Sequence, residues 1–169
     1  MRQARKIAFP AESRLYPTLD QAFYADAFET DLIDARLTPV EIAGRAFAAT
    51  PAWVDGLVLL RDRIVSPLGI KAVGRLKAPA GCGWRSLAAG DALSIFRIFS
   101  VDDTELVLGI DDSHLDVRIS FLKRADGPQA SYVVAAWVKA HNALGRLYML
   151  PVAPVHRLLV RLMMRGVPI

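Results

Sequence analysis

The sequence holds few of the residues that build disulfides, metal sites and phosphate-binding loops. Its 169 residues include one cysteine, Cys82, which excludes an internal disulfide and agrees with a cytoplasmic location. The three histidines, His114, His141 and His156, stand in none of the short spacings that hold metal ions. The glycines form no phosphate-cradling motif. We therefore expect no metal and no nucleotide cofactor.

Basic clusters and uninterrupted apolar runs are also scarce. The net charge of +4 comes from residues spread along the chain, without the basic clusters and interleaved aromatics typical of nucleic-acid binding. The most apolar stretch, residues 144–164, contains arginines and two prolines, so it does not predict a membrane-spanning helix. The chain is nevertheless 53% hydrophobic, with a mean hydropathy of +0.29. This surplus implies a large core, an apolar cavity, a dimer interface or a membrane surface.

Two helix starts follow each other closely in the first half of the chain. Thr38, Pro39 and Glu41 supply a hydroxyl cap, a proline at the first helical position and the glutamate of a capping box. They predict a helix that ends at Thr50, where Thr50 and Pro51 repeat the same start. An apolar stripe at helical spacing predicts the buried face of the second helix: Trp53, Leu57, Leu60, Ile64 and Leu68. Because almost nothing separates the two helices, they must turn sharply against each other.

Beyond residue 91 the hydrophobic period changes from helical to two. Residues 92–101, 105–111, 114–124 and 130–141 have the character of strands and are separated by turn residues. Short turns between successive strands imply an antiparallel meander rather than parallel strands with helical crossovers.

The remaining segments complete an α+β order. A first strand is expected within residues 18–35, a loop over residues 71–91 and a last helix from Pro154. This order predicts a helix-grip fold, in which a curved antiparallel sheet wraps around a long C-terminal helix, with an αα pair near the N-terminus. A single domain is expected over residues 1–169, of which residues 1–22 form a poorly defined N-terminal extension.

Three blocks of the sequence resemble a known family: "TPAWVDGLVLLRDRIVSPLGIK", "LVLGIDDSHLDVRISF" and "HNALGRLYMLPVAPVHRLLVRLMM". They are similar to the signature blocks of the family catalogued as domain of unknown function 2867, over roughly residues 25–166. The resemblance implies membership of the START/Bet v 1-like (SRPBCC) superfamily of hydrophobic-ligand-binding domains. It implies a fold and a class of ligand, and it carries no catalytic residues onto this chain.

A row of polar residues marks the third strand of the predicted meander. His114, Asp116, Arg118 and Ser120 alternate with apolar residues and should share one face of the strand. Antiparallel sheets commonly keep one face solvated, and this favoured interpretation requires no function. In the alternative, the row lies on the concave face, where Asp116 pairs with His114 or Arg118 and contacts a polar ligand group. Ionisable residues crowd the turn before His114, which keeps the alternative open.

A second group of polar residues lies where the last strand passes into the C-terminal segment. His141 could act as an acid/base, with Arg146 or Tyr148 binding a ligand carboxylate or carbonyl. The favoured alternative is local, with His141 and Asn142 bonding turn backbone and Tyr148 packing in the core. His156 belongs to the C-terminal helix, whose broad apolar face is expected to pack on the sheet rather than on a membrane surface.

Together these patterns predict non-covalent binding of a small hydrophobic or amphipathic ligand in an apolar cavity. The candidate ligand-binding residues are His114, Asp116, Arg118, His141, Arg146, Tyr148, Trp53, Phe96, Trp137 and Met163. Two alternatives stay open. One is an enzyme of cyclase, hydrolase or isomerase type that uses His114 or His141 as acid/base, and the other is a homodimer that buries the apolar surplus.

Overall fold

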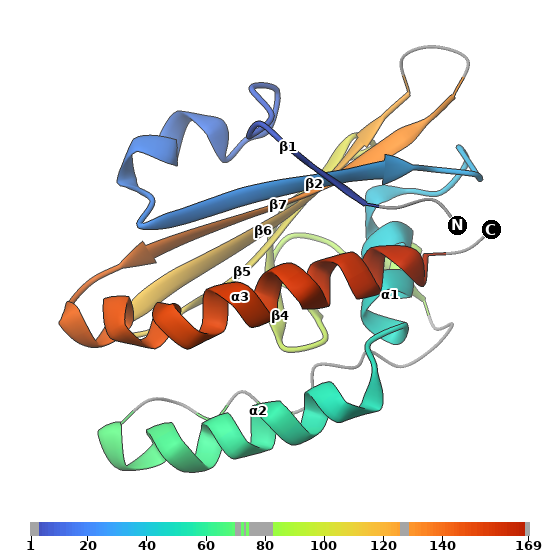
Figure 1. The fold of residues 1–169 in the computed structure, drawn as a ribbon. Helices are drawn as coiled ribbons and strands as arrows, with labels where there is room; N and C mark the ends of the chain where they lie inside the picture. Colours follow the sequence, from blue (N-terminus) through green and yellow to red (C-terminus); the bar gives the residue numbers. More distant parts are fainter. Residues whose placement is uncertain (1–3, 70–71, 73, 75–82, 126–128, 168–169) are drawn as a thin grey trace.

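A computed structural model describes residues 4–69, 72, 74, 83–125 and 129–167. A seven-stranded antiparallel sheet has the order β1-β2-β7-β6-β5-β4-β3, with α1 and α3 against one face (Figure 1). The strands are β1 (Arg5–Ile7), β2 (Tyr24–Asp31), β3 (Ala92–Leu93), β4 (Phe96–Val101), β5 (Glu105–Asp111), β6 (Leu115–Arg124) and β7 (Ser131–Ala140). The helices are α1 (Pro39–Ala48), α2 (Ala52–Val65) and α3 (Ala143–Arg165), with 3₁₀ turns at Tyr16–Gln21, Ser66–Leu68 and Trp84–Ser86.

The architecture is α+β, with a curved antiparallel sheet and a long C-terminal helix, and it is compatible with a helix-grip fold (Figure 1). The predicted meander is confirmed, since β4, β5, β6 and β7 pair in sequence order. The first strand is confirmed as β2, which pairs with β7 at the other side of the meander. The turn at residues 126–128 lies outside the described residues, as do residues 71, 73 and 75–82 of the loop predicted over residues 71–91, Cys82 among them.

The capping box predicted for the first helix is confirmed. Thr38 Oγ1 accepts a hydrogen bond from the Glu41 amide at 3.3 Å, and Glu41 Oε2 accepts one from the Thr38 amide at 2.9 Å. The helix α1 buries Ile42, Ala43 and Phe47 against the sheet. The capped helix packs against β5, β6 and α3.

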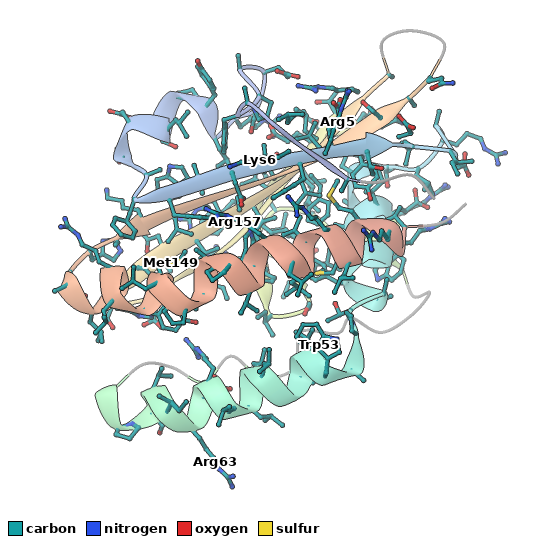
Figure 2. All side chains as sticks on the ribbon, viewed as in Figure 1. Arg5, Lys6, Trp53, Arg63, Met149 and Arg157 are labelled. Atoms are coloured by element: carbon teal, nitrogen blue, oxygen red, sulfur yellow. The ribbon has the colours of Figure 1, made fainter. Side chains whose placement is uncertain are left out.

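The buried stripe predicted for α2 is wrong. Trp53 is 46% exposed, Leu60 55% and Ile64 63%, and the buried side chains of α2 are Val54 and Val65. In Figure 1, α2 lies beside α3 on the side away from the sheet, and Figure 2 shows Trp53 at its first turn. Because α2 lies away from the sheet and a groove separates it from α3, most of its apolar side chains stay exposed.

The C-terminal helix starts earlier than predicted. It begins at Ala143, where Asn142 Oδ1 accepts a hydrogen bond from the Gly145 amide at 3.0 Å, and it runs through Pro151 and Pro154. Each proline removes one helical hydrogen bond to the carbonyl four residues earlier. Those carbonyls belong to Leu147 and Leu150, which are 64% and 67% exposed, so water can take the place of the missing donors.

The helix α3 is unbroken over 23 residues. By length and composition alone it is long and apolar enough to cross a membrane, with a window of mean hydropathy 1.2 of which 22% is buried inside the molecule. Val160, Met163 and Met164, near its C-terminal end, pack into the main core together with sheet residues.

The two faces of the sheet carry separate apolar clusters. On β6, Ile119 and Phe121 face α1 and α3, whereas Leu122 belongs to a cluster on the opposite, outer face. The outer face is covered in part by the N-terminal residues, for which the sequence predicted no defined element. Leu15 packs there against Trp137, and the buried Glu105 carboxylate accepts hydrogen bonds from Ser13, Ser120 and the amide of residue 14.

Candidate functional site

Hollow spaces lie on the helix-facing side of the sheet. A central cavity of about 180 Å³ separates the sheet from the first half of α3. A smaller end cavity of about 80 Å³ lies near the end of α3, and an apolar groove of about 410 Å³ runs between α2 and α3. His156 borders all three of these spaces. The walls of the central cavity are mainly apolar: Ile95, Phe96, Ile110, Leu115, Val117, Ile119, Ala136, Val138, Met149 and Val152, with polar contributions from Tyr24, Arg61, Asp112, His114, Tyr148 and His156.

His114 is the most buried polar residue of the central cavity. It sits in the turn between β5 and β6, where its carbonyl accepts a hydrogen bond from the His141 amide at 3.0 Å. Its side chain is 2% exposed, and neither ring nitrogen has a hydrogen-bond partner among the described residues. Nδ1 lies 3.5 Å from Asp112 Oδ2, and the ring meets the Tyr148 ring edge-on at 5.3 Å between centroids. Burial lowers the pKa of His114, which favours the neutral imidazole.

Tyr148 and Arg61 form the border between the central cavity and the groove. Arg61 Nε donates a hydrogen bond to the Tyr148 hydroxyl at 3.1 Å, and Arg61 Nη1 lies 2.6 Å from Asp62 Oδ1. Both residues line both spaces. Tyr148 is a candidate that the sequence predicts, whereas Arg61 is not, because an arginine on a helix expected to expose its polar side gives no signal of a cavity.

A second polar cluster joins β2 to α3. Asp26 has a side chain that is 1% exposed, and its Oδ1 lies 3.6 Å from Nε2 of His156. Asp26 Oδ2 accepts a hydrogen bond from the Tyr24 hydroxyl, which in turn accepts one from Arg157 Nε at 3.2 Å. Figure 2 shows Arg157 between α3 and β2. Burial raises the pKa of Asp26, but contacts with His156, Tyr24 and Arg157 outweigh it and leave the pKa below its ordinary value.

The sequence did not predict this cluster. Asp26 and His156 are 130 positions apart, and neither stands in a motif. The available signal was an acidic residue on the apolar face of a strand, since Asp26 shares its face of β2 with the buried Phe28. A carboxylate in such a position requires a polar partner from the element packed above it.

The row of polar residues on β6 divides between the two faces of the sheet. Asp116 and Arg118 point to the outer face, whereas His114 precedes the strand and turns into the central cavity. Asp116 Oδ1 lies 3.0 Å from Nε2 of His141, and Arg118 pairs with Asp111 at 2.6 Å. The favoured interpretation of an outward strand face therefore holds for Asp116 and Arg118. The pairing of Asp116 with His114 or Arg118, which belonged to the alternative, is replaced by the contacts with His141 and Asp111.

Further residues expected around the cavity lie elsewhere. Trp137 is on the outer face, where its indole N–H donates a hydrogen bond to the Thr18 carbonyl at 2.9 Å. Trp53 and Arg146 are exposed at the surface, and Arg146 lies over the Phe23 ring. His141 contributes to none of the cavities described, which leaves His114 as the buried member of the two histidines considered as acid/base. Phe96 and Met163 do line cavities, the former both the central and the end cavity.

Comparison with protein families gives one match. Residues 18–163 match the model of the family described as "Protein of unknown function (DUF2867)". The chain belongs to the DUF2867 family. Searches of curated proteins and of solved structures gave no significant match.

The polar groups of this DUF2867 protein can form hydrogen bonds inside an otherwise apolar space. Within the part of the chain that is described, no group of three or more histidine, cysteine, aspartate or glutamate residues is arranged to hold a metal ion. His114 and His156 instead present imidazole rings at the central cavity, each with a carboxylate nearby. Imidazole rings in such surroundings can bind a polar ligand group or transfer a proton.

Proposed function

We propose that this DUF2867 protein binds a small hydrophobic or amphipathic molecule in the central cavity, with the groove between α2 and α3 as its entrance. The observation that carries the proposal is the buried His114 imidazole in the wall of an apolar cavity of about 180 Å³, where neither ring nitrogen has a hydrogen-bond partner among the described residues and Nδ1 lies 3.5 Å from Asp112. A folded protein rarely keeps a buried polar group without a partner. A ligand that fills the apolar space and offers one polar group would satisfy it.

The position of the groove beside the central cavity supports its role as the entrance to that cavity. The central cavity and the groove share Arg61, Tyr148, Val152 and His156, so among the described residues these side chains alone border both spaces and movement of them would join the two. The groove is lined on its α2 side by Leu57, Leu60 and Ile64, which are partly exposed to solvent. An apolar molecule would cover these side chains on its way to the cavity, which gives the exposed stripe of α2 a function.

Binding of an uncharged fluorescent probe tests the proposal. N-phenyl-1-naphthylamine should bind saturably, with enhanced emission, and native mass spectrometry of gently purified protein should show any bound compound. Val152→Phe places a larger side chain where the cavity and the groove meet and should weaken probe binding at least tenfold. Leu150→Phe is the matched control, since Leu150 is 67% exposed on the same helix and borders none of the spaces described. Equal binding by both variants would reject the cavity as the site.

A homodimer is the second candidate function. Large apolar side chains are exposed on two neighbouring helices: Trp53, Leu57, Leu59, Leu60 and Ile64 on α2, and Leu147, Leu150, Val155 and Leu158 on α3. Exposed apolar patches of this kind are common at protein–protein interfaces. Sedimentation velocity between 1 and 200 μM, on the order of the range where typical dimers dissociate, tests it, and a monomer at every concentration would exclude it. The double variant Leu60→Lys, Leu150→Lys should dissociate a dimer formed through this surface.

A further inference from the structure

The two imidazole rings at the central cavity have the same kind of neighbour. His114 Nδ1 lies 3.5 Å from Asp112 Oδ2, and His156 Nε2 lies 3.6 Å from Asp26 Oδ1. Both distances exceed the roughly 2.9 Å of a good N–H···O hydrogen bond, and both nitrogens lack a hydrogen-bond partner among the described residues. In each ring, therefore, one nitrogen lies close to a carboxylate oxygen without forming a good hydrogen bond to it.

A carboxylate beside a ring nitrogen selects the tautomer that carries its proton there. In neutral His114 the proton is then on Nδ1, and Nε2 has the lone pair. In neutral His156 the proton is on Nε2, toward Asp26, and Nδ1 has the lone pair. Each ring is then left with a hydrogen-bond acceptor, and the acceptor of His114 is buried without a donor among the described residues.

The charges around the cavity distinguish between possible ligand groups. An ionised ligand carboxylate only accepts hydrogen bonds, so it could not pair with the acceptor nitrogens of the two rings. The nearby carboxylates of Asp112 and Asp26 would also repel its negative charge. Arg61 is the cationic residue of the cavity wall, and its guanidinium is already 2.6 Å from Asp62 and bonded to the Tyr148 hydroxyl. An uncharged hydroxyl supplies the missing donor without adding negative charge.

We infer that the ligand of the central cavity is a hydrophobic alcohol or phenol whose hydroxyl group donates a hydrogen bond to Nε2 of His114. The apolar part of the ligand lies against Phe96, Ile119 and Val138. This inference rests on the proposed function, and it adds the class of ligand and the residue that recognises it.

Three probes with one tail test the inference: 4-butylphenol, 4-butylbenzoate and butylbenzene, titrated by calorimetry at pH 8. At this pH the phenol is uncharged and the benzoate is ionised. We expect the phenol to bind at least tenfold more tightly than the benzoate. His114→Phe should weaken phenol binding about fivefold to tenfold relative to butylbenzene binding, as expected for the loss of one hydrogen bond.

The matched control is His141→Phe. His141 also has a carboxylate beside its Nε2, that of Asp116 at 3.0 Å, but it lies outside the cavity, so its replacement should alter none of the three affinities. Benzoate binding as tight as phenol binding, or a preference for phenol over butylbenzene that is as large in His114→Phe as in the wild type, would overturn the inference while the cavity remains a binding site. Failure of all three probes would reject the proposed function and this inference with it.

Discussion

Replacement of His114 by phenylalanine should stabilise the unliganded protein. The imidazole is 2% exposed and has two nitrogens without a hydrogen-bond partner among the described residues. An unsatisfied buried polar group costs about 1–3 kcal/mol, and phenylalanine removes this cost. The new ring keeps the edge-on contact with Tyr148, and the cavity beside it leaves room for the larger side chain. We therefore expect the free energy of unfolding to rise by about 1 kcal/mol or more.

Urea denaturation at pH 7.5, followed by circular dichroism, measures this change as a higher midpoint at an unchanged slope. In thermal unfolding, 1 kcal/mol corresponds to about 2–4 °C for a chain of this size. The control His141→Phe changes a partly exposed histidine and should stay within about 1 kcal/mol of the wild type. A His114→Phe variant that is less stable than the wild type would refute the account of His114 as an unsatisfied group kept for ligand binding.

The same variant should alter the pH dependence of stability. Burial, together with Arg61 and His141, lowers the pKa of His114 below the ordinary value of 6.5, against the opposing effect of Asp112. As the pH falls below 6.5, the unfolded chain takes up a proton that the folded protein resists. The wild type should lose stability from about pH 6.5 down to the lowered pKa, and His114→Phe should lose less over this interval. Parallel pH profiles for the two proteins would contradict the assigned burial effect.

Three further predictions concern the framework around the site. Thr38→Ala removes the cap of α1 and should cost about 1 kcal/mol in urea denaturation, whereas Thr38→Ser should cost less. Glu105→Gln weakens the buried bonds to Ser13 and should cost about 1–3 kcal/mol and hasten proteolysis of the N-terminal residues; an unchanged cleavage rate would show that other contacts hold them. Gly145→Ala should cost about 1–3 kcal/mol, because the added Cβ would overlap the backbone carbonyl of His114; wild-type stability would exclude this close approach.

Much of the fold could be predicted because its signals are local. The capping box at Thr38 joins residues three positions apart, and the strands of the meander are joined by short turns with their own residue preferences. The start of α3 was missed because Pro151 and Pro154 are strong helix breakers in most settings. In this helix the carbonyls left unbonded belong to exposed residues, so water can bond them.

The candidate site was predicted less completely. His114 and Tyr148 were selected from sequence and lie at the cavity, but Trp137 is on the opposite face. Residues 132–138 of β7 are apolar on both faces, so alternation does not tell which side meets the helices. The side taken by Trp137 depends on the N-terminal residues that cover the outer face of the sheet.

By itself the sequence determined the order of elements, the antiparallel meander and the presence of a histidine at the turn before β6. Propensity, capping and alternation act over a few residues, and they specify these features without reference to the rest of the chain. The tertiary structure decided which side of the sheet holds the cavity. It also decided that Asp26 on β2 lies beside His156 on α3. Contacts between residues 130 positions apart depend on how α3 lies on the sheet, and no local pattern carries that information.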